Sequence, residues 1–167
     1  MKRITLLAFG FLFSFQLMAQ SKVGTIDVDY ILSKMPELNE VNTNMNAYGK
    51  DLESQLGTKM TAYQGLVKDY QDNEINFTIA MKKTKQDEII AAEGEIQKYQ
   101  QNSGQLIQIK QNELLQPLYL KIGKTLEAIS KELGYTQVFT VNNTIAYLDP
   151  NHDLTTPVLK RMGLPTE

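Results

Sequence analysis

The chain has 167 residues, a formal net charge of −2 and no cysteine, which excludes disulfides, thiol catalysis and cysteine-bound metals. Lys2 and Arg3 carry two of the positive charges, and the chain without them stands at −4. An acidic balance of this kind excludes the basic surface by which proteins bind nucleic acid.

The first residues have the layout of a secretory signal peptide. Lys2 and Arg3 precede an apolar run from Ile4 to Met18, and Ala19 is a small residue suited to cleavage. The run is short for a membrane span, with an uncleaved anchor as the alternative. We expect residues 1–19 to be removed near Ala19 and the mature protein to be exported.

Residues 20–35 are expected to form a strand and a short helix of a small β body. Ile26 and Val28 alternate with polar residues, which is typical of a half-buried strand. A turn of helix is predicted at Tyr30–Leu32, with Asp29 as its N-cap.

Residues 36–134 are dominated by helical periodicity. No proline occurs between Pro36 and Pro117, and apolar residues recur there every three or four positions. This pattern predicts long helices that pack through a narrow seam. Because the pattern loosens between Asp72 and Gln86, we expect two antiparallel arms that reverse in this window. A single rod that pairs with other chains is the alternative.

The predicted arms contain several helix-weakening residues. Pro117 removes one helical hydrogen bond, and each interior glycine costs roughly 0.5–1 kcal/mol relative to alanine. We therefore expect arms that bend, with Gly134 closing the second arm. The interior glycines are Gly49, Gly57, Gly65, Gly94, Gly104 and Gly123.

Residues 135–167 are expected to complete the β body. Thr136–Val141 and Thr144–Leu148 read as two strands of a hairpin that turns at Asn142–Asn143. The expected fold class is α+β and mostly α: a long antiparallel helical hairpin, or tentacle, projecting from a small β body. Since so small a sheet has open edges, the body is expected to be completed by oligomerisation.

The chain closes with a loop and a short helix. Thr156 is predicted to be the N-cap, with Pro157 at the first helical position and Gly163 after the last turn. The preceding loop, Asp149–Asp153, contains the single histidine, His152.

No converging set of residues predicts catalysis, so we expect no enzyme activity, no cofactor and no metal site. His152 with Asp149 and Asp153 suits a metal or acid–base cluster, but a polar turn is the more typical use of these residues. Lys82–Lys85 is a local basic cluster. It reads as a solvated charge run, and contact with an acidic partner or a membrane surface is left open.

Six short segments, in order along the mature chain, together resemble a known family. They are Val23–Leu32, Met35–Glu37, Asn112–Leu118, Gly134–Tyr135, Asp149–Pro150 and Asp153–Leu159. The set resembles the Skp/OmpH family of periplasmic chaperones. The resemblance implies a homotrimer whose strands join into one β body, with three hairpins that hold unfolded outer-membrane proteins without ATP. Well-known members are strongly basic, whereas this mature chain is acidic.

Within that resemblance, apolar residues on the arms are the candidates for client binding. Methionine adapts its shape, and tyrosine offers apolar area with a polar tip. The candidates are Met60, Tyr63, Tyr70, Phe77, Ile79 and Met81. The alternative function is a structural coiled-coil spacer or adaptor of the cell envelope, which the same seams would support.

Overall fold

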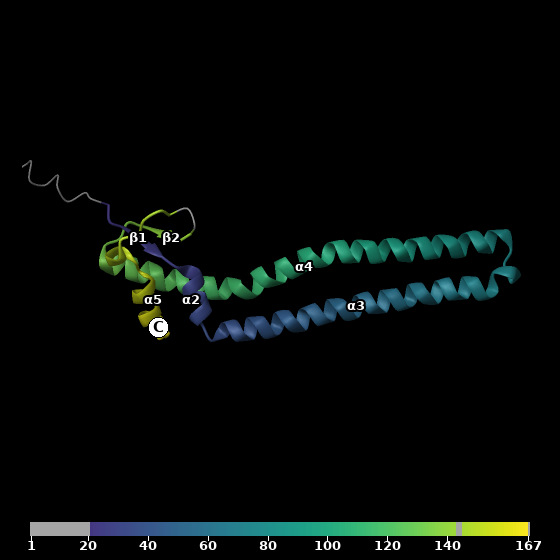
Figure 1. The fold of residues 1–167 in the computed structure, drawn as a ribbon, viewed down its shortest axis with the longest axis horizontal. Coiled ribbons are helices and arrows are strands. Elements are labelled where there is room, and N and C mark those ends of the chain that lie inside the picture. Colours follow the sequence, from purple (N-terminus) through teal and green to yellow (C-terminus); the bar gives the residue numbers. More distant parts are fainter. Residues whose placement is uncertain (1–20, 143–144, 167) are drawn as a thin grey trace, which may run out of the picture. The chain divides into compact units, whose positions relative to one another are not determined.

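The computed structural model describes residues 21–142 and 145–166, so the predicted signal peptide lies outside the described residues. The chain divides into two compact units. One unit, here called the body, comprises the described residues up to Met35 and those from Tyr119 onward. The other, the hairpin, is Pro36–Leu118. Figure 1 colours the elements of both units in chain order.

The hairpin consists of two long helices that run side by side in opposite directions (Figure 1). Helix α3 (Glu37–Asn73) has 37 residues, which corresponds to a length of about 55 Å. A single 3₁₀ turn, η2 (Glu74–Asn76), reverses the chain into α4 (Ile79–Leu133), whose residues up to Leu118 belong to this unit. The predicted antiparallel hairpin is confirmed, with its reversal inside the predicted window. The single rod is therefore excluded.

The packing between the two helices is thin. Of the apolar residues of the hairpin, all of which the structure describes, Val41, Leu52 and Leu118 are buried. The other seam residues are half-buried or exposed, because two helices alone cannot enclose a side chain from every direction. The narrow seam predicted from the apolar spacing is thus the main apolar contact within this unit.

The body is organised around strand β1 (Val23–Ile26). It pairs in parallel with β2 (Gln137–Thr140), with Val23 opposite Gln137. On its other side the carbonyl oxygen of Thr25 accepts a hydrogen bond of 2.8 Å from the backbone N–H of Leu154. Both edges of β1 are therefore occupied, and β1 is the central backbone segment of the body.

Helices cover this small sheet and form the core. The 3₁₀ turn η3 (Pro150–His152) lies beside β1 and buries none of its residues. The helices of the core are α2 (Val28–Lys34), the last turns of α4 and α5 (Thr155–Met162). Their apolar faces meet in one cluster, so the body holds the best-buried residues of the described chain. The largest fully buried side chains are those of Ile26, Ile31, Ile122, Leu154, Val158 and Leu159.

Glycine is required at position 24 because neighbouring atoms approach the backbone closely there. A Cβ at this position would lie 2.8 Å from Cε1 of Tyr135 and 3.1 Å from the carbonyl oxygen of His152. The first distance is too short for a Cβ and the second is tighter than ordinary van der Waals contact, so the ring of Tyr135 packs directly on the backbone of β1.

The predicted β-hairpin of the C-terminal region is wrong. β2 is formed by Gln137–Thr140, within the predicted Thr136–Val141, but it pairs with β1 in parallel and not with the following segment. Residues 145–148 form no strand, and residues 143–144 lie outside the described residues. A partner more than a hundred positions earlier replaces the local one, because β1 offers β2 a buried edge whereas Tyr147 is 81% exposed.

The start of α2 also differs from the prediction. Asp27, not Asp29, is the N-cap, and its Oδ1 accepts the backbone N–H of Tyr30 at 2.8 Å. Asp29 instead lies in the first turn, where its charge complements the helix dipole. The strand consequently ends at Ile26, earlier than the alternation of apolar residues suggested.

Helix α5 begins one residue before its predicted cap. Thr155, not Thr156, opens the helix, because Oδ1 of Asp153 accepts both the backbone N–H and the hydroxyl of Thr155, at 2.9 and 2.6 Å. The end of α5 is as predicted: Gly163 has a φ of 69°, in the left-handed region.

Candidate functional site

Polar contacts join the two helices of the hairpin where the apolar seam is thin. Nζ of Lys59 lies 3.0 Å from Oε2 of Glu95 on the facing helix. Nearer the reversal, Nε2 of Gln86 donates to the hydroxyl of Tyr70 at 2.8 Å. These contacts fix the register of α3 against α4 with little buried area, so much of each helix remains open to solvent.

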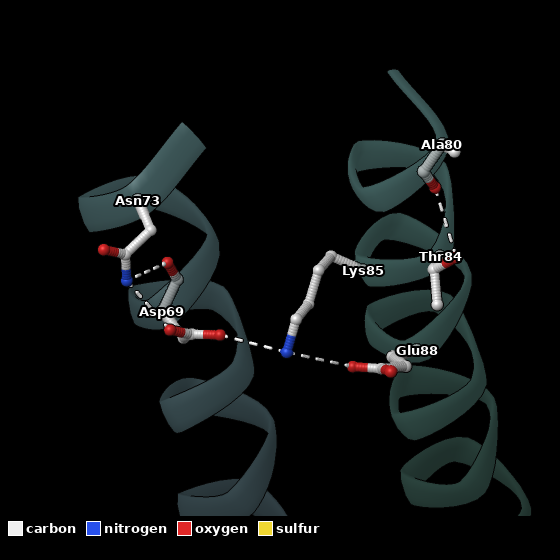
Figure 2. Close-up of polar contacts among 6 residues, drawn as sticks. All are labelled: Asp69, Asn73, Ala80, Thr84, Lys85 and Glu88. Carbon is white, nitrogen blue, oxygen red and sulfur yellow. Dashed lines mark hydrogen bonds and ion pairs between the residues drawn. The ribbon is translucent and has the colours of Figure 1, made fainter. Parts of the chain in front are cut away.

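A cluster of four side chains, here called the distal clamp, ties α3 to α4 close to the reversal. Figure 2 shows Lys85 of α4 reaching Asp69 of α3. Its Nζ lies 3.1 Å from Oδ2 of Asp69 and 3.5 Å from Oε2 of Glu88, while Nδ2 of Asn73 donates to Oδ1 of Asp69 at 2.9 Å. All four groups are partly exposed, so the clamp directs the arrangement of the helices more than it stabilises them.

The distal clamp shifts the titration of its members. Lys85 donates a hydrogen bond to Asp69 and lies beside it as a positive charge, and both effects lower the pKa of that carboxyl. The same hydrogen bond, with the nearby charge of Glu88, raises the pKa of Lys85. The clamp is therefore an ion pair at neutral pH.

The tip of the hairpin, residues 74–81, exposes aliphatic side chains. Ile75 is 91% exposed and Ile79 is 90% exposed. Phe77 is half-buried instead, because its ring packs against Tyr70 with the ring centroids 6.1 Å apart. The tip thus keeps its aromatic residue in the fold and offers its isoleucines to solvent.

The six residues predicted to bind clients fall into two groups. Ile79, Met81 and Met60 are exposed, by 90%, 48% and 44% respectively. Tyr63, Tyr70 and Phe77 are half-buried. The structure brings Tyr70 and Phe77 together near the reversal. Client binding by any of the six stays a prediction.

Three exposed isoleucines were missed by the sequence reasoning. They are Ile75, Ile90 and Ile109, with 91%, 64% and 62% of their surface exposed. A signal for Ile90 was present in the sequence, because it follows Ile89 directly and only one of two adjacent residues fits a seam with steps of three or four.

The charge of the mature chain is unevenly distributed. Residues 36–118 contain twelve aspartates and glutamates and eight lysines, a net charge of −4. Residues 20–35 and 119–167 contain seven groups of each sign. The whole negative excess therefore belongs to the hairpin.

The carboxylates of Asp149 and Asp153 accept hydrogen bonds that hold the turn around His152. Oδ1 of Asp149 accepts the backbone N–H of Asn151 at 3.0 Å, and this bond is the main reason why the pKa of Asp149 is lowered. Oδ1 of Asp153 accepts the backbone N–H of Thr155. Among the residues that the structure describes, no group of three or more potential ligands is placed to hold a metal ion. These contacts favour a polar turn.

The body exposes several large apolar side chains. Phe139 on β2 is 54% exposed, Leu120 on α4 is 57% exposed, and Tyr147 is 81% exposed. Within residues 21–142 and 145–166, β2 has β1 as its one strand partner. Exposed apolar side chains and an unpaired strand edge are both typical of a unit that pairs with another chain.

Comparisons with known proteins agree with this geometry. The family model for outer membrane proteins of the OmpH-like type matches residues 22–162. A similar solved structure, from Caulobacter crescentus CB15, is described provisionally as an outer membrane chaperone (OmpH-like). It superimposes with a TM-score of 0.64 at 11% sequence identity, covering 86% of this chain and 85% of that chain. At this identity the likeness shows the fold. No curated protein matches the sequence.

Proposed function

The chain belongs to the OmpH-like family of outer membrane proteins, and on this premise we propose that the mature protein is an ATP-independent periplasmic holdase chaperone. Its clients are unfolded outer-membrane proteins. A holdase needs no chemical step: by binding the unfolded chain it lowers the free concentration of that chain, and aggregation slows by mass action.

The observation that supports the proposal is the set of exposed aliphatic side chains on the hairpin. Ile75 and Ile79 lie at the tip, and Ile90 and Ile109 lie along α4. They are spread along the hairpin, so together they offer several small apolar contacts. Contacts of this kind suit an unfolded chain, because each is weak and tolerant of sequence while their sum is strong.

Three copies of the chain form the working assembly in this proposal. The exposed apolar side chains of the body, Phe139, Leu120 and Tyr147, support pairing of the bodies. Clients would then be held between the hairpins of the three copies. Light scattering of the mature protein at micromolar concentration is expected to give the mass of a trimer. A monomer mass would contradict the assembly.

The holdase activity is tested by dilution of a client. An outer-membrane barrel protein unfolded in urea is diluted into buffer with or without the mature protein, and aggregation is followed by light scattering. We expect suppressed aggregation and a soluble complex on gel filtration. The double variant Ile75→Ala/Ile79→Ala should suppress aggregation less well, and the matched variant Gln97→Ala/Gln101→Ala on the exposed surface of α4 should behave as wild type. Unchanged aggregation with the wild-type protein refutes the activity.

Residence in the periplasm is part of the proposal and is supported by the signal-peptide pattern of residues 1–19. The N-terminal sequence of the protein from the periplasmic fraction is expected to start at Gln20. A protein that begins at Met1 and stays with the cytoplasmic fraction would contradict this step. No helix of the described residues is long and apolar enough to cross a membrane.

A structural spacer of the cell envelope is the second candidate. The contacts between α3 and α4, such as Lys59 with Glu95, favour it because they hold the two helices in one register. Crosslinking in cells separates the two functions. A single stable partner, with no binding of unfolded chains by the purified protein, would favour the spacer.

A further inference from the structure

We propose that the hairpin selects unfolded segments rich in lysine and arginine over segments rich in aspartate and glutamate. This inference rests on the proposed holdase function and adds the charge class of its partner. The argument starts from the charge of residues 36–118, which stands at −4, while the remainder of the mature chain is balanced.

The lysines of the hairpin are largely engaged already. Five of its eight lysines lie in ion pairs with carboxylates of the same hairpin, which leaves three available to an acidic partner. The paired lysines are Lys59, Lys68, Lys82, Lys85 and Lys110. The basic run Lys82–Lys85 therefore presents far less positive charge than its sequence suggests, since Lys82 lies 3.2 Å from Glu74.

The clearest place for a cationic partner is on α4. Ile90 is 64% exposed, and Asp87 and Glu93 lie three residues before and after it. Residues spaced by three are neighbours on the surface of a helix, roughly 5–6 Å apart between their Cβ atoms. Both carboxylates are exposed and have no hydrogen bond or ion pair within residues 21–142 and 145–166.

A lysine or arginine side chain matches this arrangement in both of its parts. Its methylene stem can lie on Ile90 while its charged head meets Asp87 or Glu93 in water. An acidic side chain that approaches Ile90 meets two like charges instead. Lys83 lies two turns from Ile90 toward the tip, on the same side of the helix. Its positive charge opposes the negative charges of the two carboxylates, so removing it should have the opposite effect to removing them.

The selection is expected to depend on salt. All the groups are exposed, and charges separated by more than about 8 Å are largely screened at physiological ionic strength. The preference should therefore be largest in dilute buffer and disappear in high salt, while apolar contact with the isoleucines remains.

Three synthetic disordered peptides test the inference. They share one apolar sequence and differ only at their charged positions, which are all lysine, all glutamate or all glutamine. Fluorescence anisotropy with the mature protein in dilute buffer measures the dissociation constants. We expect the lysine peptide to bind about tenfold more tightly than the glutamate peptide, with the glutamine peptide between them. The double variant Asp87→Asn/Glu93→Gln should reduce the ratio of the dissociation constants of the glutamate and lysine peptides, and Lys83→Gln should increase it.

The outcomes separate this inference from the function on which it rests. Equal binding of the lysine and glutamate peptides, or tighter binding of the glutamate peptide, overturns the charge selection. Suppressed aggregation of the barrel protein with no binding of any peptide overturns it too, and in both cases the holdase function stands. If no peptide binds and the barrel protein aggregates as fast as it does alone, both proposals fail.

Discussion

The body and the hairpin of this chain differ in what holds them together. The body buries six large side chains completely, among them Ile31, Val158 and Leu159 at 0% exposure. The hairpin is longer, yet its buried apolar residues are three, each with 6–8% of its surface still exposed. Buried packing therefore holds the body together, while most of the surface of the hairpin stays open to solvent.

Truncation of a buried side chain should give the largest difference between the two units in the free energy of unfolding that is lost. Leu159→Ala in the body is expected to lower the free energy of unfolding by about 2–5 kcal/mol, because it leaves a cavity among fully buried neighbours. Leu52→Ala in the hairpin should lower it by less, at or below about 2 kcal/mol, because solvent can reach the vacated space. Urea unfolding curves measure both. Equal losses would remove the distinction.

Substitution of glycine by alanine should change the free energy of unfolding in opposite directions in the two units. Gly24→Ala in the body places a Cβ 2.8 Å from Tyr135 and is expected to destabilise by about 1–3 kcal/mol. Gly57→Ala in α3 meets no atom within 4 Å and should stabilise by about 0.5–1 kcal/mol. Thermal unfolding gives the two shifts. A loss of stability in Gly57→Ala would show that the hairpin needs this glycine.

Asp27 and Asp29 in the body differ in their role at the start of α2, because Asp27 is the N-cap and Asp29 is not. Asp27→Ala removes the acceptor for the backbone N–H of Tyr30 and should cost about 1 kcal/mol. Asp29→Ala is the matched control, because this residue contributes only a charge in the first turn and its loss should cost about 0.3–1 kcal/mol. Chemical denaturation ranks the two variants. The reverse ranking would restore Asp29 as the cap.

The smallest expected effect is the response of the distal clamp to pH. The pKa of Asp69 is lower in the folded protein than in the unfolded chain, so its contribution is present above its ordinary pKa and is lost as pH falls through the folded value. The pKa of Lys85 is raised, so its contribution is lost only in strong base. The clamp should therefore hold between about pH 4 and pH 10.

Amide hydrogen exchange of residues 66–90 measures this response. Below about pH 4 the protection of these amides should fall in the wild-type protein, while Asp69→Asn should show the reduced protection already at neutral pH. Asp72→Asn is the control, because Asp72 pairs with Lys68 of the same helix and does not join α3 to α4. A loss of protection in this control as large as in Asp69→Asn would argue against the clamp.

The sequence predicted the hairpin well because the determinants of a helix pair are local. Spacing of three and four along α3 and α4 marks the seam, and the loosened window contains the reversal at η2. Exposed isoleucines outside that spacing, such as Ile90, were missed because a spacing of three or four identifies only the residues of the seam.

The sheet was predicted poorly because its determinants are not local. The residues of β2 read correctly as a strand, but nothing in a stretch of six residues tells whether its partner is the next strand or a distant one. The neighbouring segment with Ile145 and Tyr147 carries the same β-branched and aromatic signal as β2, although it forms no strand. Tertiary contacts of β1 decided the pairing, and such contacts override local preference.

The parallel pairing of β1 with β2 has a consequence for the order of folding. Thr136 donates its backbone N–H to Lys22 across a separation of 114 positions, so β1 has no sheet partner until nearly the entire chain has emerged. The contacts between α3 and α4 close over shorter loops and should form earlier. We therefore expect the first strand to stay unpaired while the hairpin assembles, and closure of the sheet to be a late step of folding.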